Sequence, residues 1–381
     1  MTVRIAVLTT GRQDWGILRS TCKLLGSDSR FDLRVFAGGM HLSAAFGEGL
    51  VSLAEDGIEV CEKLRWIDDA GTTPTAQQAG EAIVQISAAL ERQRPDALLL
   101  VGDRFETLSA ATAATLAKVP VIHLHGGEET EGAIDNSIRH AITKLAHLHL
   151  VSHPLHAERV LAMGEASNAI KMVGAPGLDN AHRTDLPSRS SLERDLGIAL
   201  DAPVVLVTLH PTTLGAEPAL ELAALTEAMD SVDATYVITL PNADPGNELL
   251  RKGLVEAAGH GRRLVASALG ERRYWGLMRI ADAMVGNSSS ALIEAPVLRV
   301  PAVNIGVRQK GRLRSDNLLD VQPSAPEIAG ALKRALSPEF RASLASLGPY
   351  GDGQSAPRIL AALAAWKIPV PPIKPSIAVH L

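Results

Sequence analysis

The fold of this chain is constrained most strongly by a repeated alternation of short apolar runs with longer helical patterns. The runs are rich in Val, Ile and Leu, and each ends in glycine or polar residues. A strand covered on both faces is a near-continuous apolar run, and helices between such strands indicate parallel βαβ units. In the first half of the chain we therefore expect strands at residues 4–10, 32–39, 96–103, 119–127 and 147–152.

The second half of the chain repeats this pattern. Its expected strands cover residues 202–211, 234–241, 262–267, 281–287 and 300–306. Helical patterns lie between strands in both halves, for example at Phe105–Leu116, Asn136–Leu145 and Leu220–Met229. The fold class is therefore α/β, with two doubly wound Rossmann-like domains. Ligands of such domains bind at the carboxyl ends of the strands, so we expect the two domains to face a central cleft.

The length of 381 residues also favours two domains, because it exceeds one ordinary core. We expect an N-terminal domain over residues 1–176 and a C-terminal domain over residues 190–354. Residues 174–191 are rich in Gly, Pro, Ser and Asp and lack periodicity, which favours a linker. Residues 355–368 are expected to form a last helix, which could pack back on the N-terminal domain.

Composition excludes several classes of protein. Hydrophobic residues make up 46% of the chain and charged residues 21%, which is typical of a globular protein. The chain has 37 Lys and Arg against 42 Asp and Glu and no long basic tract, so neither nucleic acid nor a membrane surface is an expected partner. Cys22 and Cys61 form neither a disulfide framework nor a metal-ligand pair, which favours a reducing compartment. Because we find neither a signal-peptide pattern nor an apolar run of the ~20 residues that span a bilayer, we expect a cytoplasmic protein.

Several familiar motifs are absent from the sequence. It has no G-x-G-x-x-G after the first strand, no G-x-x-x-x-G-K-[ST], no G-x-S-x-G and no H-E-x-x-H. These absences argue against a dinucleotide oxidoreductase, a P-loop NTPase, a serine hydrolase of the elbow type and a zinc protease.

Two expected strand ends in the first half carry charged residues. Arg12 follows the first strand where a helix start would offer backbone N–H groups to an anion, although a plain turn with a surface arginine is the alternative. Asp103 and Arg104 follow a very apolar strand. Asp103 could act as a base, or it could cap the next helix and pair with Arg104.

The densest polar cluster is HLHGGEETEGAID, residues 123–135. Its candidate acid and base groups are His125, Glu128 and Asp135, because a carboxyl group held away from water near another charge has a shifted proton affinity. Asp135 could instead be the N-cap of the next helix. If the strand persists through both histidines, His123 and His125 should point to the same side. The Gly-Gly pair would let the backbone approach a ligand, and the spacing fits neither zinc nor a hard cation, so we expect no metal.

The strongest local signal in the second half is GNSSSALIEA, residues 286–295. Hydroxyls and free N–H groups at a helix N-terminus would form a diphosphate site, which makes Ser288 and Ser289 candidate ligands. An ordinary N-cap needs only one of the serines and is the alternative. Glu294, about two turns into the expected helix, could accept hydrogen bonds from ribose hydroxyls.

Three more strand ends add candidates in the second half. His210 precedes a proline, where a histidine is more often structural, and Asn242 could donate to a phosphate or build a turn. Arg308 begins a basic, Gly-punctuated loop that could neutralise phosphate or lie solvated.

Four segments in this order, GDRFE, HGGEETEGAIDNSIRHAITK, GNSSSALIE and RQKGR, resemble the UDP-N-acetylglucosamine 2-epimerase family. The resemblance extends from Arg12 to about Asn317. It is closest to the hydrolysing branch, which opens the sialic acid and legionaminic acid pathways. It implies a glycosyltransferase-B type fold of two facing domains, which agrees with the doubled α/β pattern, and it implies no metal or redox cofactor.

The resemblance also implies roles for residues. The C-terminal domain would bind the nucleotide through Ser288 and Ser289 on the diphosphate and Glu294 on the ribose. His210, Asn242 and Arg308 would lie nearby, with Arg12 and Arg104 from the other domain. The family's catalytic carboxylates fall at Asp103 and Asp135. A third position, Glu in some members, falls on His125, and Glu128 is the nearest carboxylate that could substitute.

The implied reaction removes the C2 proton of the sugar while the C1–O bond to UDP breaks, and water then adds to the resulting glycal. The substrate would be UDP-N-acetylglucosamine or UDP-2,4-diacetamido-2,4,6-trideoxyglucose, and the chain would form a homo-oligomer, a dimer or a tetramer. Alternatives are a non-hydrolysing 2-epimerase, a glycosyltransferase of the same fold, and a nucleotide-sugar sensor without turnover.

Overall fold

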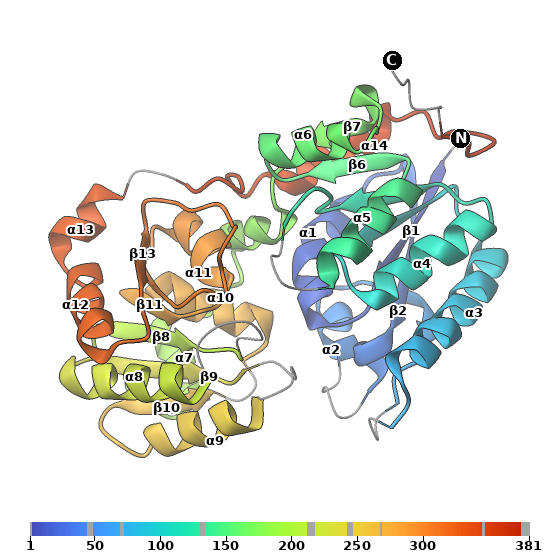
Figure 1. The fold of residues 1–381 in the computed structure, drawn as a ribbon. Coiled ribbons are helices and arrows are strands. Elements are labelled where there is room, and N and C mark those ends of the chain that lie inside the picture. Colours follow the sequence, from blue (N-terminus) through green and yellow to red (C-terminus); the bar gives the residue numbers. More distant parts are fainter. Residues whose placement is uncertain are drawn as a thin grey trace. The chain divides into compact units, whose positions relative to one another are not determined.

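The computed structural model describes residues 2–43, 49–68, 72–129, 134–211, 218–241, 247–266, 269–344 and 347–374. The chain divides into two units (Figure 1). Among the described residues, unit 1 comprises those in 2–129, 134–180 and 353–374, and unit 2 comprises those in 181–352.

A seven-stranded parallel sheet lies at the centre of the described part of unit 1, in the order β3-β2-β1-β4-β5-β6-β7. Its strands are β1 (Val3–Thr9), β2 (Phe31–Gly38), β3 (Val60–Leu64), β4 (Ala97–Val101), β5 (Val121–Leu124), β6 (Leu148–Val151) and β7 (Ile170–Met172). Its helices are α1 (Arg12–Ser27), α2 (Gly49–Glu55), α3 (Thr75–Gln93), α4 (Phe105–Leu116), α5 (Asp135–Leu145), α6 (Pro154–Ala162) and α14 (Ser355–Ala365).

Unit 2 has a six-stranded parallel sheet among its described residues, in the order β10-β9-β8-β11-β12-β13. Its strands are β8 (Val204–Thr208), β9 (Thr235–Thr239), β10 (Arg263–Ala266), β11 (Ala283–Gly286), β12 (Ala302–Ile305) and β13 (Leu318–Val321). Its helices are α7 (Arg189–Leu196), α8 (Pro218–Ser231), α9 (Asn247–Ala257), α10 (Gly270–Ile280), α11 (Ser290–Ile293), α12 (Ala325–Ala335) and α13 (Pro338–Ser343).

Alternate residues of β1 face two separate cores, as the period of two in a strand requires. Ile5 and Val7 pack in a cluster with residues of α1 and α14, among them Trp15. Ala6 and Leu8 pack in a second cluster with residues of α3, α4 and α5, which cover the other face of the sheet (Figure 1). Both faces of the sheet are therefore buried, which is why its strands are continuous apolar runs.

The predicted α/β class with two sheet-centred units is confirmed, and all ten expected strands are present. The apolar-run criterion misses β3, β7 and β13. Each of these strands is at the edge of its sheet and has partly exposed residues. An edge strand has polar neighbours on one side, so its sequence lacks the continuous apolar pattern.

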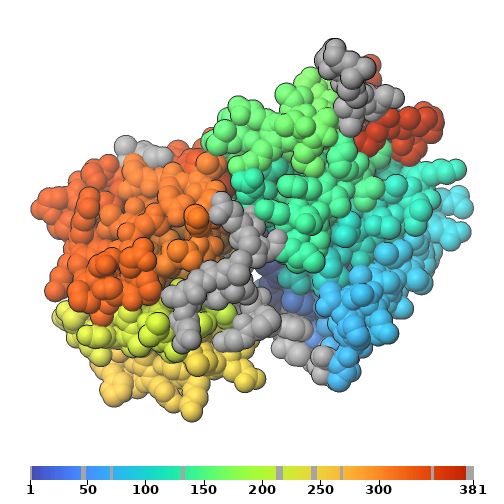
Figure 2. All heavy atoms as spheres, in the orientation of Figure 1, coloured from blue at the N-terminus to red at the C-terminus, as the bar shows by residue number. Residues whose placement is uncertain are grey.

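The helices also form much of the surface. The surface of unit 2 in Figure 2, coloured from yellow-green to red-orange, includes residues of α8, α9, α12 and α13. Across the described residues, no helix is long and apolar enough to cross a membrane.

Candidate active site

The candidate residues of unit 1 follow neighbouring strands at one edge of the sheet. Thr10 and Arg12 follow β1, Asp103 and Arg104 follow β4, and His125 follows β5. These strands lie side by side in the order β1-β4-β5, and the chain direction across the sheet reverses between β1 and β4. Such a reversal is where doubly wound sheets bind ligands, because the loops after the two strands diverge there.

Asp103 is held by an arginine that the sequence reading did not single out. The Arg139 guanidinium of α5 donates to the Asp103 carboxylate and, at 2.6 Å, to the carbonyl oxygen of Glu128. The Arg139 side chain is buried, whereas that of Asp103 is 23% exposed. Asp103 does not cap α4, because the N-cap is Arg104, and its ion-pair partner is Arg139 instead of Arg104.

Arg104 pairs with a buried carboxylate two residues along. Its Nε and Nη2 donate to the two carboxylate oxygens of Glu106 at 3.1 and 2.9 Å. Asp14 of α1 accepts hydrogen bonds from the N–H and hydroxyl of Thr10, at 2.9 and 2.5 Å. Burial raises the pKa of Asp14 to about 6, although these hydrogen bonds and the charge of Arg104 oppose the rise. The charge of Arg104 therefore acts on two buried carboxylates, those of Glu106 and Asp14.

His125 and Glu128 are joined directly. Nδ1 of His125 lies 2.6 Å from Oε1 of Glu128, and the Ser152 hydroxyl donates to the same oxygen at 2.9 Å. Nδ1 of His156 lies 2.9 Å from the Ser152 hydroxyl oxygen. Burial lowers the pKa of His156 to about 4, so that side chain is neutral at pH 7.

The two histidines of the polar stretch, His123 and His125, lie in different environments. Strand β5 ends at Leu124, and His125 has a φ of 66°, so the expected continuation of the strand through both histidines is wrong. His123 is fully buried, and its Nε2 lies 2.8 Å from the Gly102 carbonyl oxygen. Burial lowers the pKa of His123 to about 3, which makes it a neutral structural residue. A Cβ on Gly127 would lie 2.3 Å from the His156 carbonyl oxygen. The missing side chain of Gly127 therefore makes room for the backbone of His156 and not for a ligand.

Two further candidates of unit 1 lie at helix starts. Asp135 is the first residue of α5, one turn before Arg139, and it is half-buried. The N-cap is Ile134, so Asp135 is not the cap of α5. Arg12 is the first residue of α1 and is exposed.

In unit 2, Asn287 joins the loops that follow three strands. Its side chain accepts from the backbone N–H of His210 at 2.7 Å and donates to the His210 carbonyl oxygen at 2.9 Å. Its own carbonyl oxygen accepts from Arg308 at 3.1 Å and from Gln309 at 2.8 Å. Burial, assisted by the charge of Arg308, lowers the pKa of His210 to about 4. Strands β8 and β11 are neighbours at the reversal point of this sheet, so His210, Asn287 and Arg308 are placed together at its carboxyl edge.

The serine cluster differs from its expected form. Helix α11 is one turn long and ends at Ile293, so Glu294 is its C-cap instead of lying two turns inside it. The Ser288 hydroxyl accepts from the Ser290 N–H at 3.3 Å, and Ser289 is the N-cap without a side-chain cap bond. Position 286 requires glycine, because Gly286 has a φ of 138° and a Cβ there would lie 1.8 Å from the Thr208 carbonyl oxygen.

Tyr274 of α10 joins this group without having been predicted. Burial raises its pKa, opposed by hydrogen bonds with Ser290, Thr208 and Ser288, and the charge of Glu294 raises it further. The phenol therefore lies among the candidate diphosphate ligands. A tyrosine in an amphipathic helix gives no periodicity signal that separates it from a packing residue, which is why the sequence alone does not reveal it.

The remaining candidate, Asn242, lies outside the described residues. No group of three or more His, Cys, Asp and Glu side chains that could hold a metal ion is found in the described ranges.

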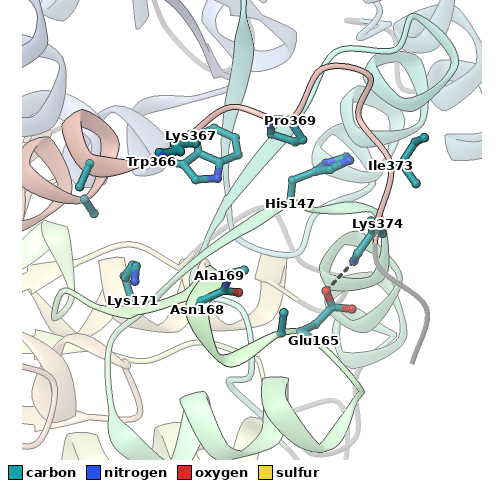
Figure 3. Close-up of a pocket in the computed structure, with 13 residues that line it drawn as sticks. His147, Glu165, Asn168, Ala169, Lys171, Trp366, Lys367, Pro369, Ile373 and Lys374 are labelled. Atoms are coloured by element: carbon teal, nitrogen blue, oxygen red, sulfur yellow. Dashed lines mark ion pairs between the residues drawn. The ribbon is translucent and has the colours of Figure 1, made fainter. Parts of the chain in front are cut away.

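A pocket of about 430 Å³ lies elsewhere in unit 1, at the amino ends of β6 and β7 (Figure 3). In it Lys374, close to the end of the described chain, reaches the buried carboxylate of Glu165 at 2.6 Å. Lys144 and His149 bind the same carboxylate at 2.6 and 3.0 Å. This ion cluster attaches the tail to the sheet edge opposite the candidate catalytic residues.

Known proteins resemble this chain over nearly its whole length. A family model described as UDP-N-acetylglucosamine 2-epimerase matches residues 23–364. The GDP/UDP-N,N'-diacetylbacillosamine 2-epimerase (hydrolyzing) of Campylobacter jejuni is 34% identical over 346 residues, which cover 89% of this chain and 88% of the relative. The UDP-N,N'-diacetylbacillosamine 2-epimerase (hydrolyzing) of Legionella pneumophila is 32% identical over 358 residues, with coverage of 93% and 94%.

A solved structure supports the fold. The UDP-GlcNAc 2-epimerase from Neisseria meningitidis, crystallised with UDP-GlcNAc, has a TM-score of 0.79 over 96% of this chain and 100% of its own. Its sequence identity of 17% is low, so the likeness concerns the fold alone.

Proposed function

Because the chain belongs to the UDP-N-acetylglucosamine 2-epimerase family, we propose that it is a hydrolysing nucleotide-sugar 2-epimerase. The reaction converts a UDP-linked 2-acetamido sugar into free UDP and the sugar with inverted C2 configuration. The observation that carries the proposal is the identity of 34% and 32% with two relatives that are both named hydrolysing 2-epimerases.

The groups of unit 1 suit the proton transfers of this reaction. A glycal forms when a base removes the C2 proton and the electrons of the C1–O bond leave with UDP. Asp103, His125, Glu128 and Asp135 supply candidate bases and acids, and Arg139 and Arg104 supply positive charge. Water then adds to the double bond, its oxygen to C1 and a proton to C2.

The groups of unit 2 suit a nucleoside diphosphate. Arg308, Ser288 and Ser289 offer a guanidinium and hydroxyls at the carboxyl edge of the sheet, and Glu294 offers a carboxylate for ribose hydroxyls. Arg12, His210 and Asn242 complete the proposed set. The proposal needs no metal, because cationic side chains neutralise the leaving group.

For the sugar we propose a 2,4-diacetamido-2,4,6-trideoxyhexose. Both hydrolysing relatives are named for N,N'-diacetylbacillosamine as its UDP derivative, and the Campylobacter jejuni relative also for the GDP derivative. UDP-N-acetylglucosamine is the competing donor.

We also propose that the protein is cytoplasmic and forms a homo-oligomer. The free thiols of Cys22 and Cys61 support a reducing compartment. The exposed apolar side chains of Val84 and Leu116, on the adjacent helices α3 and α4, support association of copies of the chain.

Incubation with each UDP and GDP donor, followed by ¹H NMR, tests the proposal. We expect UDP and a free manno-configured sugar without any acceptor, with the diacetamido donor turned over faster than UDP-N-acetylglucosamine. Release of UDP only when an acceptor sugar is added would indicate a glycosyltransferase. Formation of an epimeric UDP-sugar without UDP release would indicate a non-hydrolysing epimerase, and tight binding without turnover a sensor.

A further inference from the structure

The hydrogen bonds around Glu128 fix the positions of the protons on its neighbours. The Ser152 hydroxyl has one proton, which it donates to Oε1 of Glu128 at 2.9 Å. Nδ1 of His156 must therefore donate to the Ser152 oxygen, 2.9 Å away. The chain of donors from His156 through Ser152 ends on a carboxylate oxygen, which stabilises the ionised form of Glu128.

An ionised carboxylate can only accept hydrogen bonds, so the contact of 2.6 Å to His125 has a defined direction. Nδ1 of His125 carries the proton and donates it to Glu128. In the neutral imidazole, Nε2 then has the free lone pair. That atom is shielded from solvent and has no hydrogen-bond partner among the described residues.

An unsatisfied buried acceptor costs about 1–3 kcal/mol, so it needs a structural or functional reason. The backbone of His125 is also in the left-handed region, with a φ of 66°, which is uncommon for a residue other than glycine. Both features concern His125, and both are explained if the loop presents Nε2 to a substrate.

Resting on the function proposed above, we propose that Nε2 of His125 is the base that removes the C2 proton, and that Glu128 is a positioning residue that fixes the Nδ1–H tautomer. In this step the C2–H bond breaks and an Nε2–H bond forms. The C2–H electrons form the C1–C2 double bond, and the C1–O electrons leave with UDP. The imidazolium is stabilised by the adjacent Glu128 carboxylate. Glu128 therefore does not itself act as the third catalytic carboxylate of the family. Instead, it enables His125 to act as the base at that position.

His125 suits this step better than the candidate carboxylates do. An imidazole is ordinarily a stronger base than a carboxylate, with a proton affinity matched to neutral pH, and the C2–H is weakly acidic. Asp103, in contrast, is ion-paired to Arg139. In a Ser-His-Asp triad an aspartate likewise accepts the Nδ1–H of a histidine and fixes its tautomer, so that Nε2 can take a proton.

Variants separate the two roles. H125N should release UDP at least ~100-fold more slowly than wild type, the usual contribution of a general base, while still hydrating an added 2-acetamidoglycal. E128Q should lower kcat with little change in KM, because Glu128 acts through His125. E129Q is the matched control, since Glu129 is partly exposed and pairs with Arg159, and it should behave as wild type.

The pH profile supplies a readout that a structural role would not move. E128Q removes a negative charge 2.6 Å from the imidazole, so the acid limb of the kcat profile should move to lower pH. The histidines that face His125, His123 and His156, have pKa values of about 3 and about 4 and produce no limb above pH 5. Asp14, with a pKa of about 6, titrates in this range, but its limb does not depend on Glu128.

A measurement without turnover completes the test. Two-dimensional ¹⁵N NMR of protein labelled at histidine, with the His125 signals assigned by their loss in H125N, should find the proton on Nδ1 in wild type and not in E128Q. A proton on Nε2 in wild type, UDP release by H125N near the wild-type rate, or an unmoved acid limb in E128Q would overturn the inference. If wild type releases UDP from no donor, the proposed function fails, whereas the NMR result still decides the tautomer.

Discussion

The Arg139 guanidinium binds the carboxylate of Asp103, 36 positions earlier in the chain, while its Nη1 donates to the carbonyl oxygen of Glu128 at 2.6 Å. One buried side chain of α5 thus connects the loops that follow β4 and β5. The position of both loops depends on a residue that belongs to neither.

Replacing Arg139 with methionine should therefore disturb both stability and activity. We expect the free energy of unfolding to fall by about 2–4 kcal/mol. This is less than the usual loss on breaking a fully buried ion pair, because the Asp103 side chain is partly exposed. UDP release should fall with it. R139K should recover part of the stability, since its single ammonium cannot contact both oxygens in the same way. Urea unfolding measures the effect, and R92M, which removes the ion pair between the exposed Arg92 side chain and Glu62, should destabilise the protein less than R139M does.

Asn287 should control nucleotide binding in unit 2. N287A leaves the N–H and carbonyl of His210 without their side-chain partner, and each buried unsatisfied group costs about 1–3 kcal/mol. We expect Kd for UDP to rise at least about tenfold by isothermal titration calorimetry, which corresponds to about 1.4 kcal/mol. The exposed Asn168 of unit 1 provides the control, N168A, whose Kd should equal that of wild type. An equal Kd in N287A would show that this loop does not serve the nucleotide.

Gly286 and Gly330 should respond in opposite directions to alanine. A Cβ at Gly286 would lie 1.8 Å from the Thr208 carbonyl oxygen, and its φ of 138° is strained for other residues. G286A should fold poorly or lose more than about 4 kcal/mol. A Cβ at Gly330, in helix α12, meets nothing within 4 Å, so G330A should add about 0.4–1 kcal/mol. Urea unfolding of both variants checks the contrast, and a stable G286A would contradict the packing.

Glu165 should make stability depend on pH in acid. Burial raises its pKa, but hydrogen bonds from His149, Lys144 and Lys374 outweigh burial and bring the pKa to about 2, below the ordinary 4.5. The carboxylate therefore stabilises the fold above pH 4.5, and this stabilisation is lost as the pH falls from about 4.5 to about 2. E165Q should be less stable than wild type at pH 7, with a difference that shrinks toward pH 3. Urea midpoints at several pH values test this, and E339Q, at an exposed glutamate, should follow wild type at every pH.

The sequence predicts strand ends better than it predicts contacts. Asp103 and His210 lie at the strand ends where continuous apolar runs place them, because burial on both sheet faces leaves a strong pattern in the chain. The ion-pair partner of Asp103 could not be predicted from such a pattern. Arg139 lies on an amphipathic helix, where a charged residue is ordinarily solvated, and only the packing of α5 turns it toward β4.

The serine cluster illustrates the same division. Its residue types indicate a polar strand end, but the length of α11 depends on Pro296 and the packing that follows it, so Glu294 is a C-cap and not an interior residue. Tyr274 and Asn287 acquire their importance from neighbours that are distant along the chain.

The sequence by itself determined the α/β class, the two parallel sheets and the family, because apolar periodicity and ordered motifs are properties of the chain. Only the tertiary structure decided that Arg139 binds Asp103 and that Glu128 orients His125. The reason is physical: hydrogen bonds act over about 3 Å and depend on direction, so they are set by how separate elements pack and not by the spacing of residues along the chain.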